Sequence, residues 1–534
     1  MDRRVFLLGS LAALVTACSS SKEAGSPTTA TSPATPATPT PSTTTTAAPT
    51  TTAPATTAAA TTTPTSATLP PAAPPFTWGV ASGDPLPDRV MLWTRVDTSG
   101  DAEVTWEVAT DAQFRSVAAR GAATATAADD YTLHVDAAGL QPDTRYWYRF
   151  TSGAASVAGR TRTMPAADAT PEKLRFGFGS CQDWQGGFYA AHRDAVASDL
   201  DLFVWLGDYI YEYGAAAGAP RRHTGDTCLT LADYRTRYAL YRSDVDLQAA
   251  HAAYPWLVVW DDHEVQNNYA AAVSEDATVS EADFLARRAQ AYQAWWEWMP
   301  TRLPKPTDAT LRIYREVAFG TLARLFLLDG RQYRSDQACG DAVLSTAAPC
   351  AEWDDAGRTM LGDEQEAWLL QGLTASTATW NVLGNQVVMG DARLNGAVLN
   401  YDQWDGYPVA RQRLLDGITA SGKRNVVVVT GDIHLSAVAD LATTPGAAPV
   451  ATELVGTSIS SGALLPEQLE SAINLFPALK YINAHQRGWV RNEITRDGWT
   501  AEYRVVTDVR VAGSPVQTDA TFTIAPTTPG AVRR

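Results

Sequence analysis

The chain lacks the features of a nucleic-acid-binding, nucleotide-binding or serine-nucleophile protein. Its 534 residues carry a formal net charge of −16, and no cluster of Lys or Arg interrupts that negative charge. DNA would meet repulsion unless bound cations reversed the local field, so we expect no stable nucleic-acid complex. No G-x-G-x-x-G or P-loop motif stands between a strand and a helix. The Gly-x-Ser-x-Gly turn of serine hydrolases is also missing.

The apolar run from Val5 to Ala17 is too short to cross a bilayer as a helix. Arg3-Arg4 precede it, and together they resemble a twin-arginine export signal. Residues 15–18, Val-Thr-Ala-Cys, resemble a bacterial lipobox, which would make Cys18 the lipidated first residue of the mature protein. The alternative is an ordinary cleaved signal peptide in which this cysteine has no role. We therefore predict a signal peptide over residues 1–18. The expected location is extracytoplasmic, as a lipid-anchored or secreted protein.

Cysteine is scarce, with five residues in the chain. Cys339 and Cys350 flank a short Ala/Ser/Thr loop, and outside the cytoplasm a disulfide between them is expected. Cys228 is then unpaired or pairs with one of those two, and the sequence leaves this choice open. Cys181 directly follows an apolar run, where it is either a ligand or a small buried core residue.

Composition and periodicity divide the chain into segments. Thr, Ala, Pro and Ser dominate residues 19–75, which predicts an extended, disordered stalk. Residues 76–165 alternate with period two between turn residues, as in a small β-sandwich domain. Within it, residues 140–148 resemble the turn into a strand with a tyrosine corner. Residues 170–515 alternate strands with helices, which predicts an α/β catalytic domain, and residues 516–534 remain as a C-terminal tail.

Two helices are expected in the α/β region. Glu281 to Met299 forms the first, with aromatic residues that core packing explains better than a carbohydrate platform. The second opens at Gly362, because acidic residues fill the turn that follows. Strand-like segments return after Thr452. Two β-rich halves around helices predict a sandwich of two sheets with helices outside.

Four apolar runs each end in acidic, histidine or thiol side chains. They cover residues 176–181, 203–208, 257–264 and 426–434. Such runs are typical of buried strands, and in open α/β sheets functional groups gather beyond the carboxyl ends of the strands. Four such ends in one sheet predict a polynuclear metal site.

The residue types at these ends favour hard cations. Asp208 and Asp432 each follow a glycine, which lets the backbone pass close to an ion. A carboxylate can bridge two cations, and Asp208 is our candidate for that role. Tyr211 follows three residues later, and a phenolate is a ligand favoured by ferric iron.

These motifs resemble the signature blocks of the PhoD-type alkaline phosphatases, in the calcineurin-like metallophosphoesterase superfamily. The resemblance also extends to residues 79–85 and 92–95, so it covers nearly all of the chain after the stalk. The blocks that carry it, in family order, are Gly179-Ser180-Cys181, residues 207–212, residues 260–268 and Thr430-Gly431-Asp432-Ile433-His434.

The resemblance implies a four-layer αββα metallophosphoesterase sandwich, preceded by a small fibronectin III/Ig-like β-sandwich domain. It also implies a site with Fe3+ and Ca2+. Cys181, Asp208 and Tyr211 would face iron, with Asp208 bridging to calcium. Asp432 and His434 match the last metal-binding block.

The third block leaves its ligand open. Asn268 and Asp262 are both candidates, and we rank Asn268 first. His263 either donates a hydrogen bond or proton toward the phosphate or leaving oxygen, or orients Asp262. Arg487 and Asn268 are candidate substrate-binding residues, because a guanidinium suits phosphate oxygens.

The implied reaction is hydrolysis of phosphate monoesters and diesters by a metal-bound hydroxide, with release of phosphate. His263 and Asp208 are the candidate catalytic residues. Small-molecule phosphate esters are the expected substrates, with phospholipids as further candidates, and we expect a monomer whose membrane contact is limited to a lipid on Cys18. The alternatives are a phospholipase D-like phosphodiesterase and a non-catalytic surface protein stabilised by metals.

Overall fold

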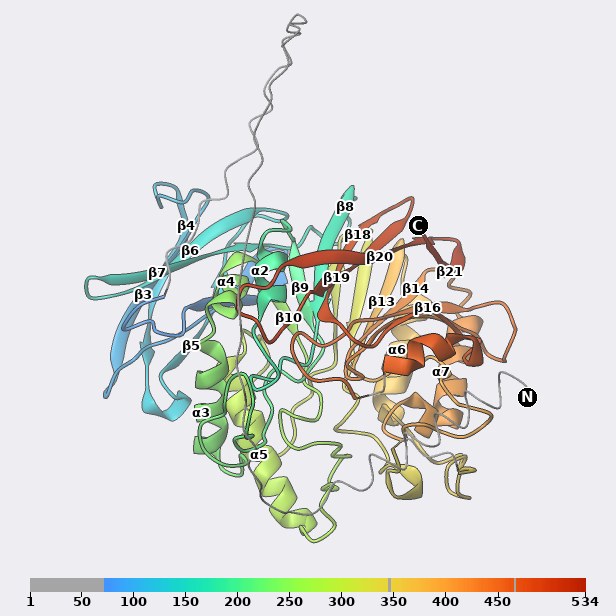
Figure 1. The fold of residues 1–534 in the computed structure, drawn as a ribbon. Helices are drawn as coiled ribbons and strands as arrows, with labels where there is room; N and C mark the ends of the chain where they lie inside the picture. Colours follow the sequence, from blue (N-terminus) through green and yellow to red (C-terminus); the bar gives the residue numbers. More distant parts are fainter. Residues whose placement is uncertain (1–71, 344–346, 465–466) are drawn as a thin grey trace, which may run out of the picture. The chain divides into compact units, whose positions relative to one another are not determined.

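The computed structural model describes residues 72–343, 347–464 and 467–534 (Figure 1). Its strands form sheets of ten, seven and four strands. The predicted signal peptide, residues 1–18, lies outside the described residues, as does all but the last part of the predicted stalk, residues 19–75. The architecture is mixed α/β and largely sheet, as expected.

The ten-stranded sheet has the order β21 (Thr528–Arg533), β20 (Val516–Ala525), β19 (Trp499–Val506), β18 (Arg487–Thr495), β8 (Lys173–Gly179), β9 (Leu202–Trp205), β10 (Trp256–Val258), β1 (Val80–Leu86), β2 (Arg89–Arg95) and β5 (Thr132–Ala138). It contains four adjacent parallel strands, β8, β9, β10 and β1, and the first three of these lead to the site.

The C-terminal segment, residues 516–534, is not a tail but continues the ten-stranded sheet as β20 and β21. Ala520, Phe522 and Ile524 alternate along β20, and all three side chains are buried in the main core. This period-two pattern is that of a strand with one buried face. Assigning these residues to a tail was therefore wrong.

The seven-stranded sheet is buried on both faces. Its order is β11 (Arg315–Phe319), β12 (Ala323–Leu327), β13 (Trp380–Asn385), β14 (Val426–Thr430), β16 (Ala451–Val455), β15 (Ser436–Leu441) and β17 (Leu479–Asn483). In β14, Val427 and Val429 join the core shared with the ten-stranded sheet. Val426 and Val428 point the other way, into a second core that includes residues of α6 (Gly362–Ala375) and α7 (Pro408–Ala420). Figure 1 shows these two helices beside this sheet.

The other α-helices of the described residues are α2 (Ala190–Val196), α3 (Leu231–Arg242), α4 (Val245–Ala253) and α5 (Glu281–Trp298). Their 3-10 helices are η1 (Ala127–Asp129), η2 (Ala338–Gly340), η3 (Trp404–Gly406) and η4 (Glu467–Leu475). Helix α5 is the predicted aromatic helix. Ser280 caps it by accepting a hydrogen bond from the Asp283 backbone. Trp295 and Trp298 are completely buried, as the packing interpretation requires.

The N-terminal strands make a smaller sandwich that is continuous with the large sheet. The four-stranded sheet has the order β4 (Val117–Ala125), β3 (Ala102–Ala109), β6 (Arg145–Ser152) and β7 (Ala155–Arg162). A separate core packs between it and β1, β2 and β5. The Tyr146 hydroxyl accepts a hydrogen bond from the Gln141 backbone at 2.8 Å, as in a tyrosine corner. β1 pairs with β10 in parallel, with Gly83 opposite Trp256, so the two sandwiches share a sheet.

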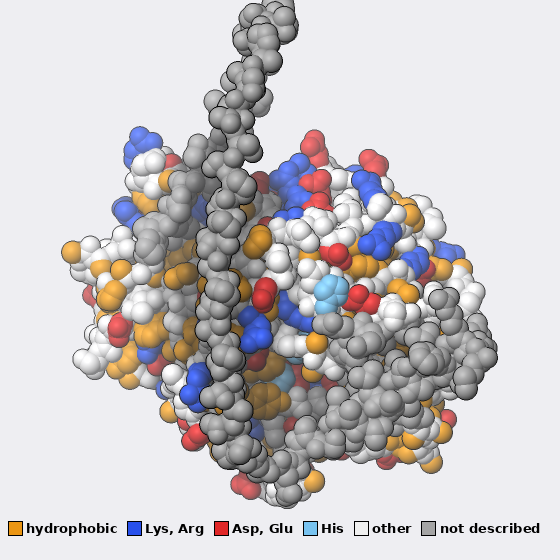
Figure 2. Space-filling model, viewed as in Figure 1, with side chains coloured by type: hydrophobic (Ala, Val, Ile, Leu, Met, Phe, Trp, Pro, Cys, Tyr) orange, Lys and Arg blue, Asp and Glu red, His pale blue; other side chains and the backbone are white. Residues whose placement is uncertain are grey.

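No helix of the described residues combines the length and apolar character needed to cross a membrane. On the face shown in Figure 2, basic and acidic side chains are interspersed. Many of the arginines are in ion pairs with neighbouring carboxylates, such as Arg145 with Asp199 at 2.7 Å.

Candidate metal centre

The four predicted strand ends converge, but they do not belong to one sheet. β8, β9 and β10 are parallel neighbours in the ten-stranded sheet, whereas β14 lies in the seven-stranded sheet. The expectation of a single sheet was therefore wrong. The ends still meet because the two sheets pack face to face through a common core.

Two glycines allow the close approach of these ends. Gly207 has φ of +110°, and a Cβ there would lie 2.4 Å from the Asp261 Cβ. A Cβ on Gly431, at the end of β14, would lie 2.4 Å from the hydroxyl oxygen of Ser180, which follows β8. Any larger residue at either position would push two strand ends apart.

Five of the predicted site residues have left-handed backbone conformations, which non-glycine residues adopt rarely. Each such residue costs about 1–3 kcal/mol, and such positions cluster at functional sites. The φ values are +59° at Cys181, +57° at Asp208, +50° at Asn268, +62° at Asp432 and +56° at His434. The surrounding fold thus imposes the conformation that directs these side chains.

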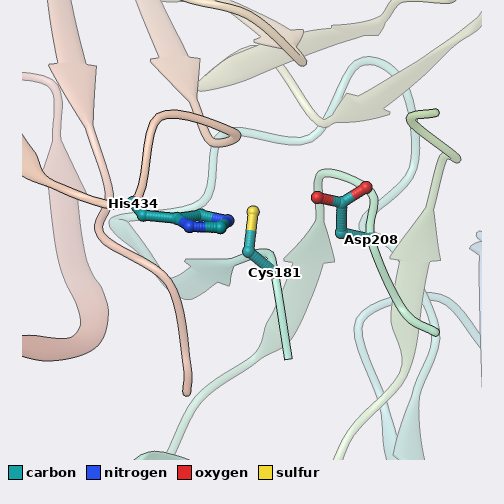
Figure 3. Close-up of side chains that lie close together, drawn as sticks. All are labelled: Cys181, Asp208 and His434. Carbon is teal, nitrogen blue, oxygen red and sulfur yellow. The ribbon is translucent and has the colours of Figure 1, made fainter. Parts of the chain in front are cut away.

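Cys181, Asp208 and His434 form the first group of ligand atoms. Their sulfur, oxygen and nitrogen atoms lie within 4.8 Å of one another, and Figure 3 shows the sulfur between the imidazole and the carboxylate. The Tyr211 hydroxyl lies 3.0 Å from Asp208 Oδ2 and 3.0 Å from His434 Nε2. Four side chains from three strand ends therefore meet at one point.

The orientation of His434 suits a ligand. Its Nδ1 lies 2.6 Å from the Gly462 carbonyl oxygen. A carbonyl can only accept, so Nδ1 carries the hydrogen and Nε2 offers its lone pair toward Cys181 and Asp208. Burial lowers the pKa of His434 to about 3, which keeps the ring neutral.

Two further groups of ligand atoms extend the site. Within each group, the ligand atoms lie within 4.8 Å of one another. One contains Asp208, Asp262 and His263, and the other contains Asp208, Asp261, Asp262 and Asp432. Asp208 belongs to all three groups, as a bridging carboxylate must. Within the described part of the chain, Asp261 Oδ2 and Asp262 Oδ1 are buried without a hydrogen-bond partner. Buried carboxylate oxygens that accept no hydrogen bond, beside a thiol, a phenol and an imidazole, fit a site for cations.

The electrostatics of the cluster also call for positive charge. Burial raises the pKa of Asp208 well above its usual range. The nearby His263 lowers this pKa, whereas the Asp262 carboxylate raises it further. Burial, together with Asp402, raises the pKa of Asp432 to about 7. Burial and Asp208 likewise raise the pKa of the Cys181 thiol. Cations among these groups would stabilise their charged forms.

Arg331 supplies positive charge from within the protein. Its guanidinium is completely buried and binds both oxygens of Asp402, at 2.6 and 2.8 Å. It also donates to Asp261 and lies 3.4 Å from Asp262 and 3.5 Å from Asp432. These contacts connect the site's carboxylates to one another.

Two glutamates form hydrogen bonds that fix the positions of site residues. The sequence analysis did not single out either of them. Glu212 Oε2 lies 2.8 Å from His263 Nδ1, and the Tyr211 ring packs on the His263 ring at 4.1 Å between centroids. Glu264 accepts hydrogen bonds from the backbone of Asp208, Tyr209 and Asp261. Both glutamates stand inside the motif blocks, but only the fold reveals their partners.

The two candidate substrate-binding residues occupy different settings. Arg487 is buried, and its guanidinium donates to the carbonyl oxygens of His434 and Ala484. It thus supports the His434 backbone, and a contact with phosphate stays a prediction. Asn268 lies beside the cluster, where its backbone N–H donates to Asp262 Oδ2 at 2.6 Å.

Known proteins are similar to this chain in sequence and in fold. The family model for PhoD-like phosphatase matches residues 176–503, and the model for the PhoD-like phosphatase N-terminal domain matches residues 59–165. Alkaline phosphatase D of Bacillus subtilis (strain 168) is 41% identical over 473 residues, which cover 84% of this chain and 80% of that protein. A solved structure entitled "Structure of PhoD" matches with a TM-score of 0.82 and 40% identity, over 86% of this chain and 92% of the other.

The fold, the candidate site and the similarity to known phosphatases together define a hydrolase that acts on phosphoric ester bonds. Its two matched regions lie in the order expected from the sequence motifs. The chain belongs to the PhoD-like phosphatase family.

Proposed function

We propose that the chain is an exported alkaline phosphatase of the PhoD type that uses Fe3+ and Ca2+ to hydrolyse phosphate monoesters and also diesters. The proposal rests on one observation: Cys181, Asp208, Tyr211 and His434 meet at a point where Asp208 is shared with two further acidic groups. In this proposal the domain is the four-layer αββα sandwich of metallophosphoesterases, preceded by a fibronectin III/Ig-like domain.

The donor types divide the site between two kinds of cation. Cys181 and Tyr211 offer a thiolate and a phenolate, which suit Fe3+. Asp262, Asn268 and Asp432 offer oxygen atoms only, which suit Ca2+. Asp208 lies between the two sets and is the proposed bridge.

When bound, these cations neutralise the charge on a phosphate ester and lower the pKa of water, which promotes its attack on phosphorus. His263 is the proposed proton donor. Burial opposes its charged form, but Glu212, Asp262 and Asp208 raise its pKa well above the usual range. Glu212 holds Nδ1, so Nε2 is left to protonate the leaving oxygen as the phosphorus–oxygen bond breaks.

Removal of metals should abolish activity. We expect purified protein to contain iron and calcium by elemental analysis, and a chelator to reduce hydrolysis of p-nitrophenyl phosphate to background. Calcium added back to protein that has retained its iron should restore hydrolysis. Full activity in protein free of both metals would contradict the proposal.

The same assay separates the substrate classes when a diester, bis-p-nitrophenyl phosphate, and phosphatidylcholine are included. An observation supports an apolar substituent on the ester. A cavity lined by Val388, Leu435, Val455 and Ile482 is also lined by Gln403. Gln403 donates a hydrogen bond to Asp432 Oδ2 at 2.6 Å. Faster hydrolysis of phosphatidylcholine than of either nitrophenyl ester would favour the phospholipase D-like alternative.

We also propose export by the twin-arginine route, with Cys18 as the lipid anchor. The support is the sequence of residues 1–18. Full-length protein expressed in a bacterium with lipoprotein processing should sediment with membranes, whereas Cys18→Ala should be soluble outside the cytoplasm. A matched change of a distant thiol, Cys228→Ala, should leave the membrane fraction unaltered. Equal distribution of all three proteins would rule out the anchor.

A further inference from the structure

In the disulfide-closed loop Cys339–Cys350, the described residues around Asp341 lie beside the acidic site. Cys339 and Cys350 are joined, with their Cα atoms 5.5 Å apart, while Cys181 and Cys228 are free among the described cysteines. This confirms the pairing expected first and leaves Cys228 unpaired. Next to the disulfide, Ala338 packs against Val398 and Tyr401 in a small core.

This loop places Asp341 against Asn268. The Asn268 side-chain Nδ2 donates to Asp341 Oδ2 at 2.6 Å. Asp341 itself is held on both sides, because its backbone N–H donates to Ala338 and the nearby Val343 bridges to Asn400. The carboxylate is therefore fixed in place rather than carried on a free surface side chain.

The contact sets the direction of the Asn268 amide. Asp341 Oδ2 accepts this hydrogen bond, so it selects the amide nitrogen of Asn268 and turns the amide oxygen, Oδ1, away from itself. The backbone of Asn268 is fixed as well, since its N–H donates to Asp262 and its carbonyl accepts from Gln337 at 2.8 Å. Oδ1 is the atom of this side chain that a hard cation would use.

We infer that Asp341 is a positioning residue: held by the Cys339–Cys350 loop, it orients Asn268 so that the amide oxygen serves the Ca2+ site. The inference rests on the proposed function, which makes Asn268 a calcium ligand. Residues that orient a ligand in this way typically change metal affinity by about 10–100-fold when removed. Asp341 also retains a second oxygen, Oδ1, that is buried without a hydrogen-bond partner among the described residues.

A double-mutant cycle tests the inference. Calcium binding is measured by titration calorimetry on calcium-depleted full-length wild type, Asn268→Ala, Asp341→Ala and the double variant, with folding checked by thermal unfolding. We expect each single change to raise the Kd for Ca2+ about 10-fold or more, and the double change to add little. Non-additivity follows because Asp341 acts through the Asn268 side chain.

Two outcomes would overturn the inference, and they differ. If Asp341→Ala raises the Kd equally with and without Asn268, or not at all, Asp341 does not orient that amide. If Asn268→Ala binds Ca2+ like wild type, Asn268 is not a ligand, and the calcium part of the proposed function fails together with the inference.

Three further variants sharpen the result. Asp341→Asn keeps an oxygen that can accept from Asn268 Nδ2, so it should recover most of the affinity; an Asn variant as weak as Ala would contradict the inference. Asp354→Ala removes an exposed carboxylate close along the chain and should leave the Kd unchanged. The double variant Cys339→Ser/Cys350→Ser should weaken Ca2+ binding by less than Asp341→Ala does. The backbone bridge between Val343 and Asn400 remains in that variant and still holds this segment.

Discussion

Replacing Asp208 with Asn is expected to lower kcat/KM for a phosphate ester by about 1,000-fold or more. The amide keeps the shape of the side chain but loses the charge that all three groups of ligand atoms share. An amide also cannot bridge two cations as a carboxylate does. Steady-state kinetics on p-nitrophenyl phosphate, together with elemental analysis, measures both losses.

A buried aspartate outside the site is the matched control. Asp201 is buried and pairs with Arg145 and Arg162, away from the three groups. Asp201→Asn should cost stability while retaining iron, calcium and kcat/KM. An Asp208→Asn protein with wild-type metal content and activity would remove Asp208 from its proposed role.

Replacing Arg331 with Met should destabilise the fold by about 3–5 kcal/mol, because it leaves buried carboxylates without their cation. The guanidinium is completely buried and contacts Asp261 and Asp402 directly. The free energy of unfolding, measured by urea denaturation, is the readout. Arg331→Lys keeps the charge but not the forked contacts, so an intermediate loss is expected.

An exposed arginine supplies the comparison for Arg331. Arg145 has a side chain that is 54% exposed, and it pairs with Asp199 and Asp201. Arg145→Met should cost less than about 1 kcal/mol, as exposed ion pairs generally do. If Arg331→Met and Arg145→Met lose equal stability, the buried network does not contribute as proposed.

The sequence predicted the parts of the site that follow local patterns. Asp208 and His434 follow within a few residues of the ends of β9 and β14, and such apolar strand ends can be recognised without a structure. Helix α5 was predicted within one residue of its end, because its cap and aromatic pattern are local. The Cys339–Cys350 disulfide also followed from spacing and compartment.

The parts that depend on distant pairing were not predicted. Arg331 meets Asp402 across 71 positions of sequence, and Asp402 follows no apolar strand. Asp341 gives no sign of its contact with Asn268, since the register of a loop against a site is decided by tertiary packing. Strand β14 was placed in the wrong sheet because sheet membership depends on the face that each strand buries.

The parallel pairing of β1 with β10 makes the N-terminal strands part of the hydrolase itself. A protein cut between residues 165 and 170 would leave β10 as an open strand edge, with backbone groups that could join another chain. The two regions that family models treat separately thus contribute strands to one sheet. Any shortened version of this enzyme should begin upstream of Val80.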